Sequence, residues 1–283
     1  MEPLALVKAA AAAGVRLLAI SDHDTLAGVR ELCAPGREPL PLELLSAVEI
    51  NSVAAGIDSL WEGELHILGL GVDPNDDAFE AALARQRNLR AARFHHIVRR
   101  LRELGYPIEE QADRLLAAVG ASPGTSLGRP QIARCLVAAG HAESVDDAMQ
   151  RLLARGRPGY VPRDGLGPRE AISAVRAAGG LPALAHFADG AERRDLVGEL
   201  AAAGLGGLEV HYRHFDAATV AELGGLAREL GLVQTGGSDY HGDVETYAQA
   251  HAALYVPDED ATEVFASLGR PSSPTDGNRA ATS

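Results

Sequence analysis

Hydrophobic and polar residues alternate along this chain in one repeated order: a helix rich in Ala and Leu, a glycine, a short apolar strand, and a cluster of His and Asp. The unit recurs at residues 8–24, 174–189, 200–214 and 226–241. Glycine suits the left-handed residue that ends a helix, and an apolar run of about four to six residues is typical of a parallel strand buried on both faces. The pattern therefore predicts an α/β fold with parallel strands.

Residues of the kind that bind metals follow these strands. In a closed α/β barrel the strand ends converge on one face, so ligands distant in sequence share one site. Taken alone, His66 or His186 also fits a core histidine that is hydrogen-bonded to backbone. The set together favours a metal site, with these candidates: Asp22, His23, Glu49, His66, His186, Asp239 and His241.

The pattern changes in the middle of the chain, where the strand signals stop. Helices are predicted there at residues 76–104, 108–119, 130–139 and 145–154. Most of the arginines lie in this part of the chain, and those of the long helix are predicted to form a solvated face. We predict a barrel built from residues 1–72 and 164–270, a helical insertion domain at 73–163, and a disordered tail at 271–283.

Composition narrows the class of protein. The net charge of -13 argues against a stable nucleic-acid complex, because phosphate contacts need a basic surface. A small phosphorylated substrate held by metals remains compatible with it. Cys33 and Cys135 form no disulfide framework, which favours a cytoplasmic location. The apolar stretch 4–20 is interrupted by Lys8 and Arg16, so no membrane segment is predicted.

The ordered motifs resemble those of the PHP (polymerase and histidinol phosphatase) family of metal-dependent phosphoesterases. The matching segments are 20–25 (ISDHDT), 48–50 (VEI), 66–69 (HILG), 128–130 (GRP), 185–186 (AH), 208–210 (LEV) and 237–242 (GSDYHG). The chain is most similar to the branch with an inserted helical domain, which includes nucleoside 3',5'-bisphosphate phosphatases and 5'-to-3' exoribonucleases acting on short RNA. The resemblance implies a distorted (β/α)7 barrel with two or three divalent metals, Mn, Zn or Fe.

The resemblance also assigns metal ligands. Glu49 is expected to bridge the first and second metals, with Asp239 on the first. His66 and His186 are expected to complete the second site. The third metal is assigned to His23 and His241.

Further residues are expected to act on the substrate, a small nucleotide or a short RNA. Arg129 is expected to bind its phosphate with a planar, bidentate grip, and Gln131 stands where the branch usually has a histidine. His23, Asp22 and His241 form the expected catalytic group, in which His241 or His23 helps to protonate the leaving oxygen. His211 and His214 are predicted either to line the substrate entrance or to be surface residues of a loop, each on equal grounds.

One departure from the family keeps alternatives open. Family members begin with a strand that carries a His-x-His pair, and this chain begins at Met1 in the helix expected after that strand, so the first strand is predicted to be missing. The first alternative is a truncated or degenerate protein that binds metal or phosphate without turnover. The others are a histidinol-phosphatase-like phosphomonoesterase and an amidohydrolase, which uses similar ligands. No pattern indicates an oligomeric state.

Overall fold

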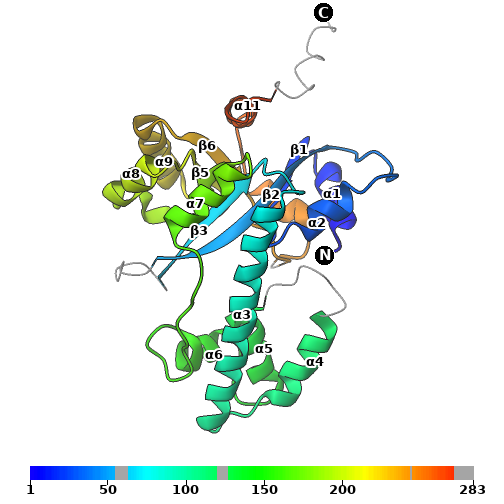
Figure 1. Ribbon diagram of the computed structural model, residues 1–283, viewed down its shortest axis with the longest axis vertical. Coiled ribbons are helices and arrows are strands. Elements are labelled where there is room, and N and C mark those ends of the chain that lie inside the picture. The colour runs from blue at the N-terminus through cyan, green and yellow to red at the C-terminus, as the bar shows by residue number, and fades with distance from the viewer. Residues whose placement is uncertain (55–62, 120–126, 243, 271–283) are drawn as a thin grey trace, which may run out of the picture.

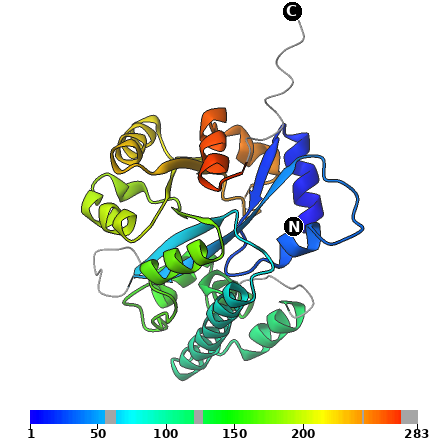
Figure 2. The ribbon, with the colours of Figure 1, turned by 45° about the horizontal axis from the view of Figure 1, so that its top comes forward.

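The strands form one curled sheet, with helices packed around its outside (Figures 1 and 2). The computed structural model describes residues 1–54, 63–119, 127–242 and 244–270; the predicted disordered tail, 271–283, lies outside them. Within these ranges six strands follow one another across the sheet in chain order. They are β1 (Leu17–Ile20), β2 (Glu43–Val53), β3 (Glu64–Leu70), β4 (Leu181–Leu184), β5 (Gly207–Tyr212) and β6 (Val233–Gly237).

The helices fall into two groups. One group surrounds the sheet: α1 (Pro3–Ala12), α2 (Ala27–Leu32), α7 (Pro168–Ala177), the short η3 (Ala188–Gly190), α8 (Arg194–Ala202), α9 (Ala217–Leu230), α10 (Tyr247–Ala252) and α11 (Asp258–Ser267). The other follows β3 in the chain: α3 (Asp77–Glu103), α4 (Glu109–Val119), α5 (Arg129–Ala138), α6 (Val145–Ala148) and the π-helical turn η2 (Met149–Leu153). The α/β fold class is thus confirmed.

The glycines of the repeated unit have the predicted conformation. Gly14, Gly179, Gly204 and Gly231 all have positive φ, between 66° and 104°. Each follows a helix and precedes a strand, where a residue with a β-carbon would be strained. The repeat therefore marks helix ends correctly.

One strand, β3, differs from the parallel strands predicted for the repeated unit. It pairs antiparallel with both β2 and β4, whereas β1–β2, β4–β5 and β5–β6 are parallel. An antiparallel strand begins at the sheet edge where its parallel neighbours end. His66, the third residue of β3, consequently lies at the same edge as the residues that follow the other strands.

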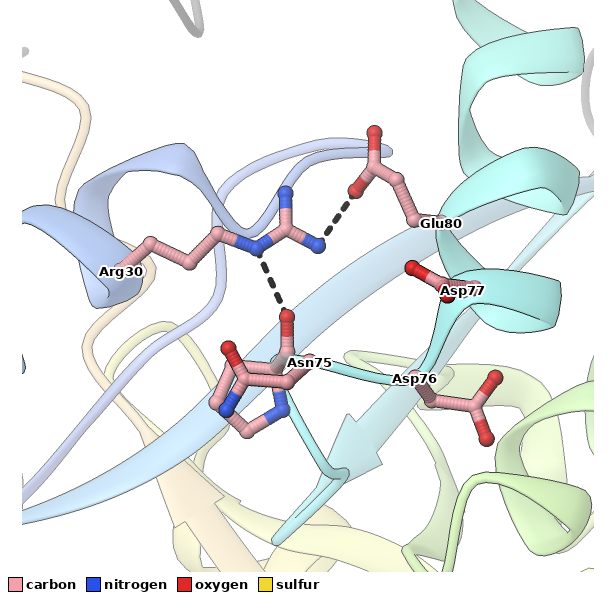
Figure 3. Close-up of a pocket in the computed structure, with 6 residues that line it drawn as sticks. Arg30, Asn75, Asp76, Asp77 and Glu80 are labelled. Carbon is pink, nitrogen blue, oxygen red and sulfur yellow. Dashed lines mark hydrogen bonds and ion pairs between the residues drawn. The ribbon is translucent and has the colours of Figure 1, made fainter.

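The long helix α3 begins at a capped and anchored turn. The Asp76 carboxylate accepts a hydrogen bond from the Phe79 N–H at 2.7 Å, which satisfies one of the helix's first donors. Arg30 of α2 donates to the Pro74 carbonyl at 2.7 Å and lies 2.6 Å from Glu80 (Figure 3). A polar cavity of about 270 Å³ lies between these residues. The two contacts of Arg30 hold the start of α3 against α2, at the point where α3 leaves the sheet.

Among the described residues there are two large hydrophobic cores and a small one, which packs Val264 of α11 against the sheet. The first joins the sheet to its surrounding helices and includes Ile50, Ile67 and Phe79, all at most 3% exposed. The second lies wholly in the helices that follow β3, around Phe94 and Ile132. Figure 1 shows α3 running from the sheet to that second group. No helix in the described ranges is both long and apolar enough to cross a bilayer.

Candidate metal centre

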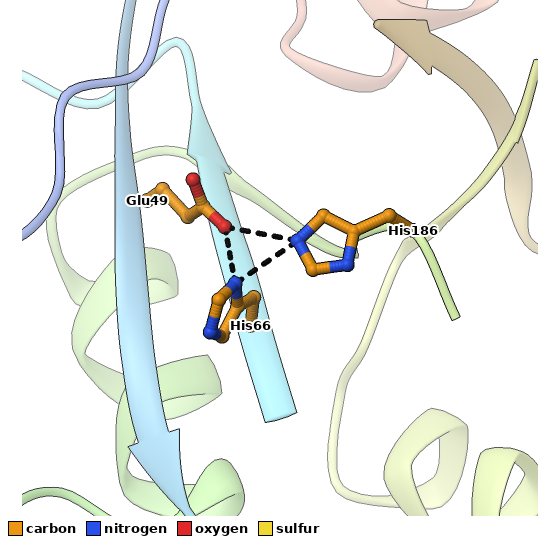
Figure 4. A group of neighbouring side chains, drawn as sticks. All are labelled: Glu49, His66 and His186. Carbon is orange, nitrogen blue, oxygen red and sulfur yellow. Dashed lines mark hydrogen bonds and ion pairs between the residues drawn. The ribbon is translucent and has the colours of Figure 1, made fainter. Parts of the chain in front are cut away.

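Three candidate ligands meet at the sheet edge. Of the described residues, Glu49 of β2, His66 of β3 and His186 after β4 form the one group whose ligand atoms lie within 4.8 Å of one another (Figure 4). Glu49 Oε1 lies 2.6 Å from His66 Nδ1 and 3.2 Å from His186 Nε2, and the two ring nitrogens are 2.9 Å apart. The three donor atoms thus converge on one point.

The second oxygen of Glu49 points to another candidate ligand. Its Oε2 lies 3.4 Å from His23 Nδ1, a buried atom that makes no hydrogen bond. Glu49 is 4% exposed. Burial raises its pKa, but the neighbouring charges of His23 and His66 and the hydrogen bonds from His186 and His66 outweigh burial and hold the pKa well below its usual range. Glu49 is therefore an anion with one oxygen facing His66 and His186 and the other facing His23.

The remaining candidates surround this group. The His241 ring centroid lies 5.6 Å from that of His23, and His241 Nδ1 lies 2.9 Å from the Asp239 carbonyl oxygen. Asp239 Oδ2 accepts a hydrogen bond from the Tyr212 hydroxyl at 3.2 Å. Burial raises the pKa of Asp22, which precedes His23. Asp239, His23 and His241 are adjacent to the Glu49 group without being part of it.

The backbone at the site is strained. Within the described ranges, the non-glycine residues with positive φ are Asp24 (54°), His186 (32°) and Asp239 (45°), and all three follow strands at this edge. Such conformations cluster at functional sites and persist when the surroundings hold them. Glu209, 4% exposed, provides one such support, because its Oε2 accepts the His186 N–H at 2.6 Å.

Charges around His186 favour its protonated form. Burial lowers the pKa of His186, but its hydrogen bond to Glu49 and the charges of Glu49 and Glu209 raise it to about 9. Burial also raises the pKa of Glu209 to about 8.

A large cavity opens from the metal-ligand candidates toward the helical segment. Its volume is about 790 Å³, and its lining includes His23, His66, His186 and His241. Arg129, at the start of α5, lines it and is 9% exposed, and burial lowers the pKa of its guanidinium. Gln131 lines it too, and its Oε1 accepts the Gly128 N–H at 3.0 Å. Arg90, Arg93, Arg134 and Arg163 add further positive charge.

The two histidines predicted at the substrate entrance have other contacts. His211 Nε2 lies 2.8 Å from Asp260 Oδ2 of α11, and both side chains are largely buried. The His214 ring makes an edge contact with Tyr212, with centroids 5.3 Å apart. The cavity lining does not include either histidine. His211 therefore joins α11 to the sheet.

Several residues at the site had no predicted role. Asp24 is fully buried and pairs with Arg90 of α3 at 2.5 Å, and Arg90 also donates to Asn51. The predicted solvated face of α3 is wrong for Arg90 and Arg93, whose side chains are 12% and 11% exposed. One sequence signal was available for Asn51, since it lies two residues after Glu49 on β2 and so shares its face.

The residues present fit a divalent cation. One carboxylate and two imidazoles form a donor set that suits zinc, manganese or iron. Two ring nitrogens held 2.9 Å apart beside a buried carboxylate, with the unsatisfied His23 Nδ1 next to them, are an arrangement that a cation stabilises.

Comparisons with known proteins agree with this geometry. The chain is 35% identical over 259 residues to the 5'-3' exoribonuclease Rnm of Escherichia coli (strain K12), covering 85% of this chain and 80% of that protein. It is 29% identical over 254 residues to the 3',5'-nucleoside bisphosphate phosphatase of Chromobacterium violaceum, covering 85% and 82%. A solved structure described as a metal-dependent phosphoesterase from Bifidobacterium adolescentis matches with a TM-score of 0.77 and 31% identity, covering 95% of this chain and 93% of that one. No family model matches the chain.

The curled α/β sheet and the glutamate–histidine group at its edge, together with these relatives, define a metal-dependent phosphoesterase. The chain belongs to the PHP family. The predicted family and enzyme class are confirmed, and so is the use of divalent metal.

Proposed function

We propose that this enzyme hydrolyses phosphate esters of small nucleotides, such as nucleoside 3',5'-bisphosphates, or of the 5' ends of short RNA. The observation that carries this proposal is the shared cavity: the Glu49, His66 and His186 group meets a set of largely buried arginines across about 790 Å³. A phosphate at the metal group would leave room for the rest of a nucleotide beside those arginines. The activities for which the exoribonuclease and bisphosphate phosphatase relatives are named support this substrate class.

We propose two or three divalent metals, Mn, Zn or Fe. Glu49 Oε1 would hold one with His66 and His186, and Glu49 Oε2 faces His23 as a bridging carboxylate would. Asp239 would serve the first metal, and His23 and His241 the third. Bound at these ligands, divalent cations activate water near neutral pH and neutralise phosphate charge. The free thiols of Cys33 and Cys135 agree with a cytoplasmic location.

The protein's own side chains would bind the substrate and supply the proton for the leaving oxygen. Arg129 would bind a phosphate oxygen from the helical side of the cavity, with Gln131 beside it as a neutral hydrogen-bond donor. His241 is half exposed and lies next to His23, where either imidazole can give a proton to the leaving oxygen. Asp22 would support this pair from the neighbouring position. His211 and His214 lie near the end of β5, and a role at the substrate entrance stays a prediction.

The test is phosphate release from adenosine 3',5'-bisphosphate and from a short 5'-phosphorylated RNA, with added manganese, alongside elemental analysis of the protein. Release that depends on bound metal would support the proposal. A folded, metal-loaded protein that releases no phosphate from either substrate would favour the non-hydrolysing alternative.

Arg129→Ala is expected to raise KM about ten- to a hundredfold with a smaller change in kcat. The reason is that a charge-assisted hydrogen bond is worth about 1.5–3 kcal/mol, and this one would form with substrate. Steady-state kinetics on the bisphosphate would measure it. Arg99→Ala, which removes an exposed arginine of α3, is the control and should leave KM unchanged. An unchanged KM in Arg129→Ala would remove Arg129 from the substrate site.

A further inference from the structure

A chain of hydrogen bonds joins the helical segment to the metal centre. Arg90 Nη2 of α3 donates to Asp24 Oδ2 at 2.5 Å and to Asn51 Oδ1 at 2.8 Å. The other end of the Asn51 amide, Nδ2, lies 2.6 Å from His66 Nε2. The opposite ring nitrogen, His66 Nδ1, faces Glu49 Oε1 at 2.6 Å.

We propose that Asn51 is a positioning residue, which holds the His66 ring at Nε2 so that Nδ1 faces the metal. This inference rests on the proposed metal site. Asn51 and His66 are paired neighbours in the β2–β3 ladder, so the backbone brings their side chains together on one face. Asn51 is 5% exposed and Asp24 is fully buried. These contacts are therefore shielded from water. A hydrogen bond is stronger in such a buried place than in water.

The amide is suited to this position because it offers both a donor and an acceptor. It can donate to Nε2 when the ring proton is on Nδ1, and after turning end over end it can accept from Nε2–H when the proton is there. The second arrangement leaves the Nδ1 lone pair free to bind a cation. It turns Nδ2 toward Arg90, so the Arg90–Asn51 hydrogen bond belongs to the first arrangement. A carboxylate at position 51 could accept a hydrogen bond from Nε2–H in the second arrangement but could not donate one in the first. An aliphatic side chain would make no hydrogen bond to His66 in either arrangement.

The arrangement of α3 supports the same assignment. Gln86 Nε2 donates to the Asn51 carbonyl at 3.3 Å, one helical turn before Arg90. Arg87 Nη1 donates to the Asp24 carbonyl at 2.9 Å. One face of the long helix thus contacts Asp24, which follows His23, and Asn51, which lies two residues after Glu49. The helical segment therefore packs against residues of the metal centre, and it also forms one wall of the substrate cavity.

The experiment compares metal binding by the wild type, Asn51→Leu and Asn51→Asp. Leucine branches at the same carbon as asparagine but has no polar atom. We expect Asn51→Leu to weaken Mn²⁺ or Zn²⁺ binding about 10- to 100-fold, the usual effect of losing a partner of a metal-bound histidine. Asn51→Asp should restore affinity to within about threefold of the wild type, since its oxygen accepts from Nε2–H and a ligand's outer hydrogen bond can be carried by a carboxylate. Titration calorimetry measures affinity, and the visible spectrum of the Co²⁺ form reports ligand geometry.

Wild-type metal affinity and spectrum in a folded Asn51→Leu would overturn the inference and leave the proposed function intact. Equal losses in Asn51→Leu and Asn51→Asp would also overturn it. A wild type that binds no divalent metal would overturn the proposed function and this inference together.

Discussion

Glu49→Gln is expected to lower kcat/KM by about a thousandfold or more, which corresponds to a loss of about 4 kcal/mol of transition-state stabilisation. The amide has the same shape as the carboxylate, but it lacks the negative charge that faces His23, His66 and His186. It would therefore bind divalent metal poorly at both of its oxygens. Phosphate release with added manganese, together with metal content by elemental analysis, measures both effects.

The matched control is Glu31→Gln, which removes the charge of an exposed glutamate of α2 that pairs with Arg37. It should keep wild-type metal content and kcat/KM. Circular dichroism of both variants shows whether the fold survives. Wild-type activity in a folded Glu49→Gln would contradict the assignment of Glu49 as the central ligand.

Phe94→Ala is expected to destabilise the protein by about 3–5 kcal/mol, the usual cost of deleting a buried aromatic ring from a core. Phe94 is 1% exposed and belongs to the core formed by the helices after β3. We propose that residues 73–163 form a separate domain on the barrel, 1–72 with 164–270. If so, the loss of stability in Phe94→Ala should be confined to residues 73–163. Hydrogen exchange should rise in α4, α5 and α6 while β4 and β5 stay protected.

Phe79→Ala is the matched control, because Phe79 lies on the same helix but packs into the core of the sheet. Its expected exchange pattern is the reverse, with faster exchange in the strands than in α4 and α5. Denaturant unfolding of both variants gives the free energies. Uniform loss of protection along the whole chain in both variants would show a single cooperative unit and contradict the two-domain proposal.

Much of the fold follows from the sequence because its signals are local. The glycine that ends each repeated helix is fixed by backbone sterics, and Gly14 and Gly231 have the expected positive φ. The long helix predicted at 76–104 is observed at Asp77–Glu103. The direction of β3 could not be predicted in this way, because a short apolar run has the same pattern in a parallel and an antiparallel strand.

The site was predictable for its metal-ligand candidates and not for their supports. His66 and His186 follow from residue type and from position near strand ends, and the structure brings both to Glu49. Arg90 carries no such signal, since its neighbours Arg85 and Arg99 on the same helix are exposed. Whether an arginine is solvated or buried against Asp24 depends on which face of the helix docks, and this is decided by tertiary packing.

The left-handed backbone at Asp24, His186 and Asp239 bears on the evolutionary history of the chain. Each such residue costs on the order of 1 kcal/mol or more, which a glycine at the same position would avoid. A lineage kept for its folded shape alone would gain stability by drifting to glycine at these three places. The chain instead has side chains with carboxylate and imidazole groups there, at the edge of the sheet where the proposed metal ligands lie.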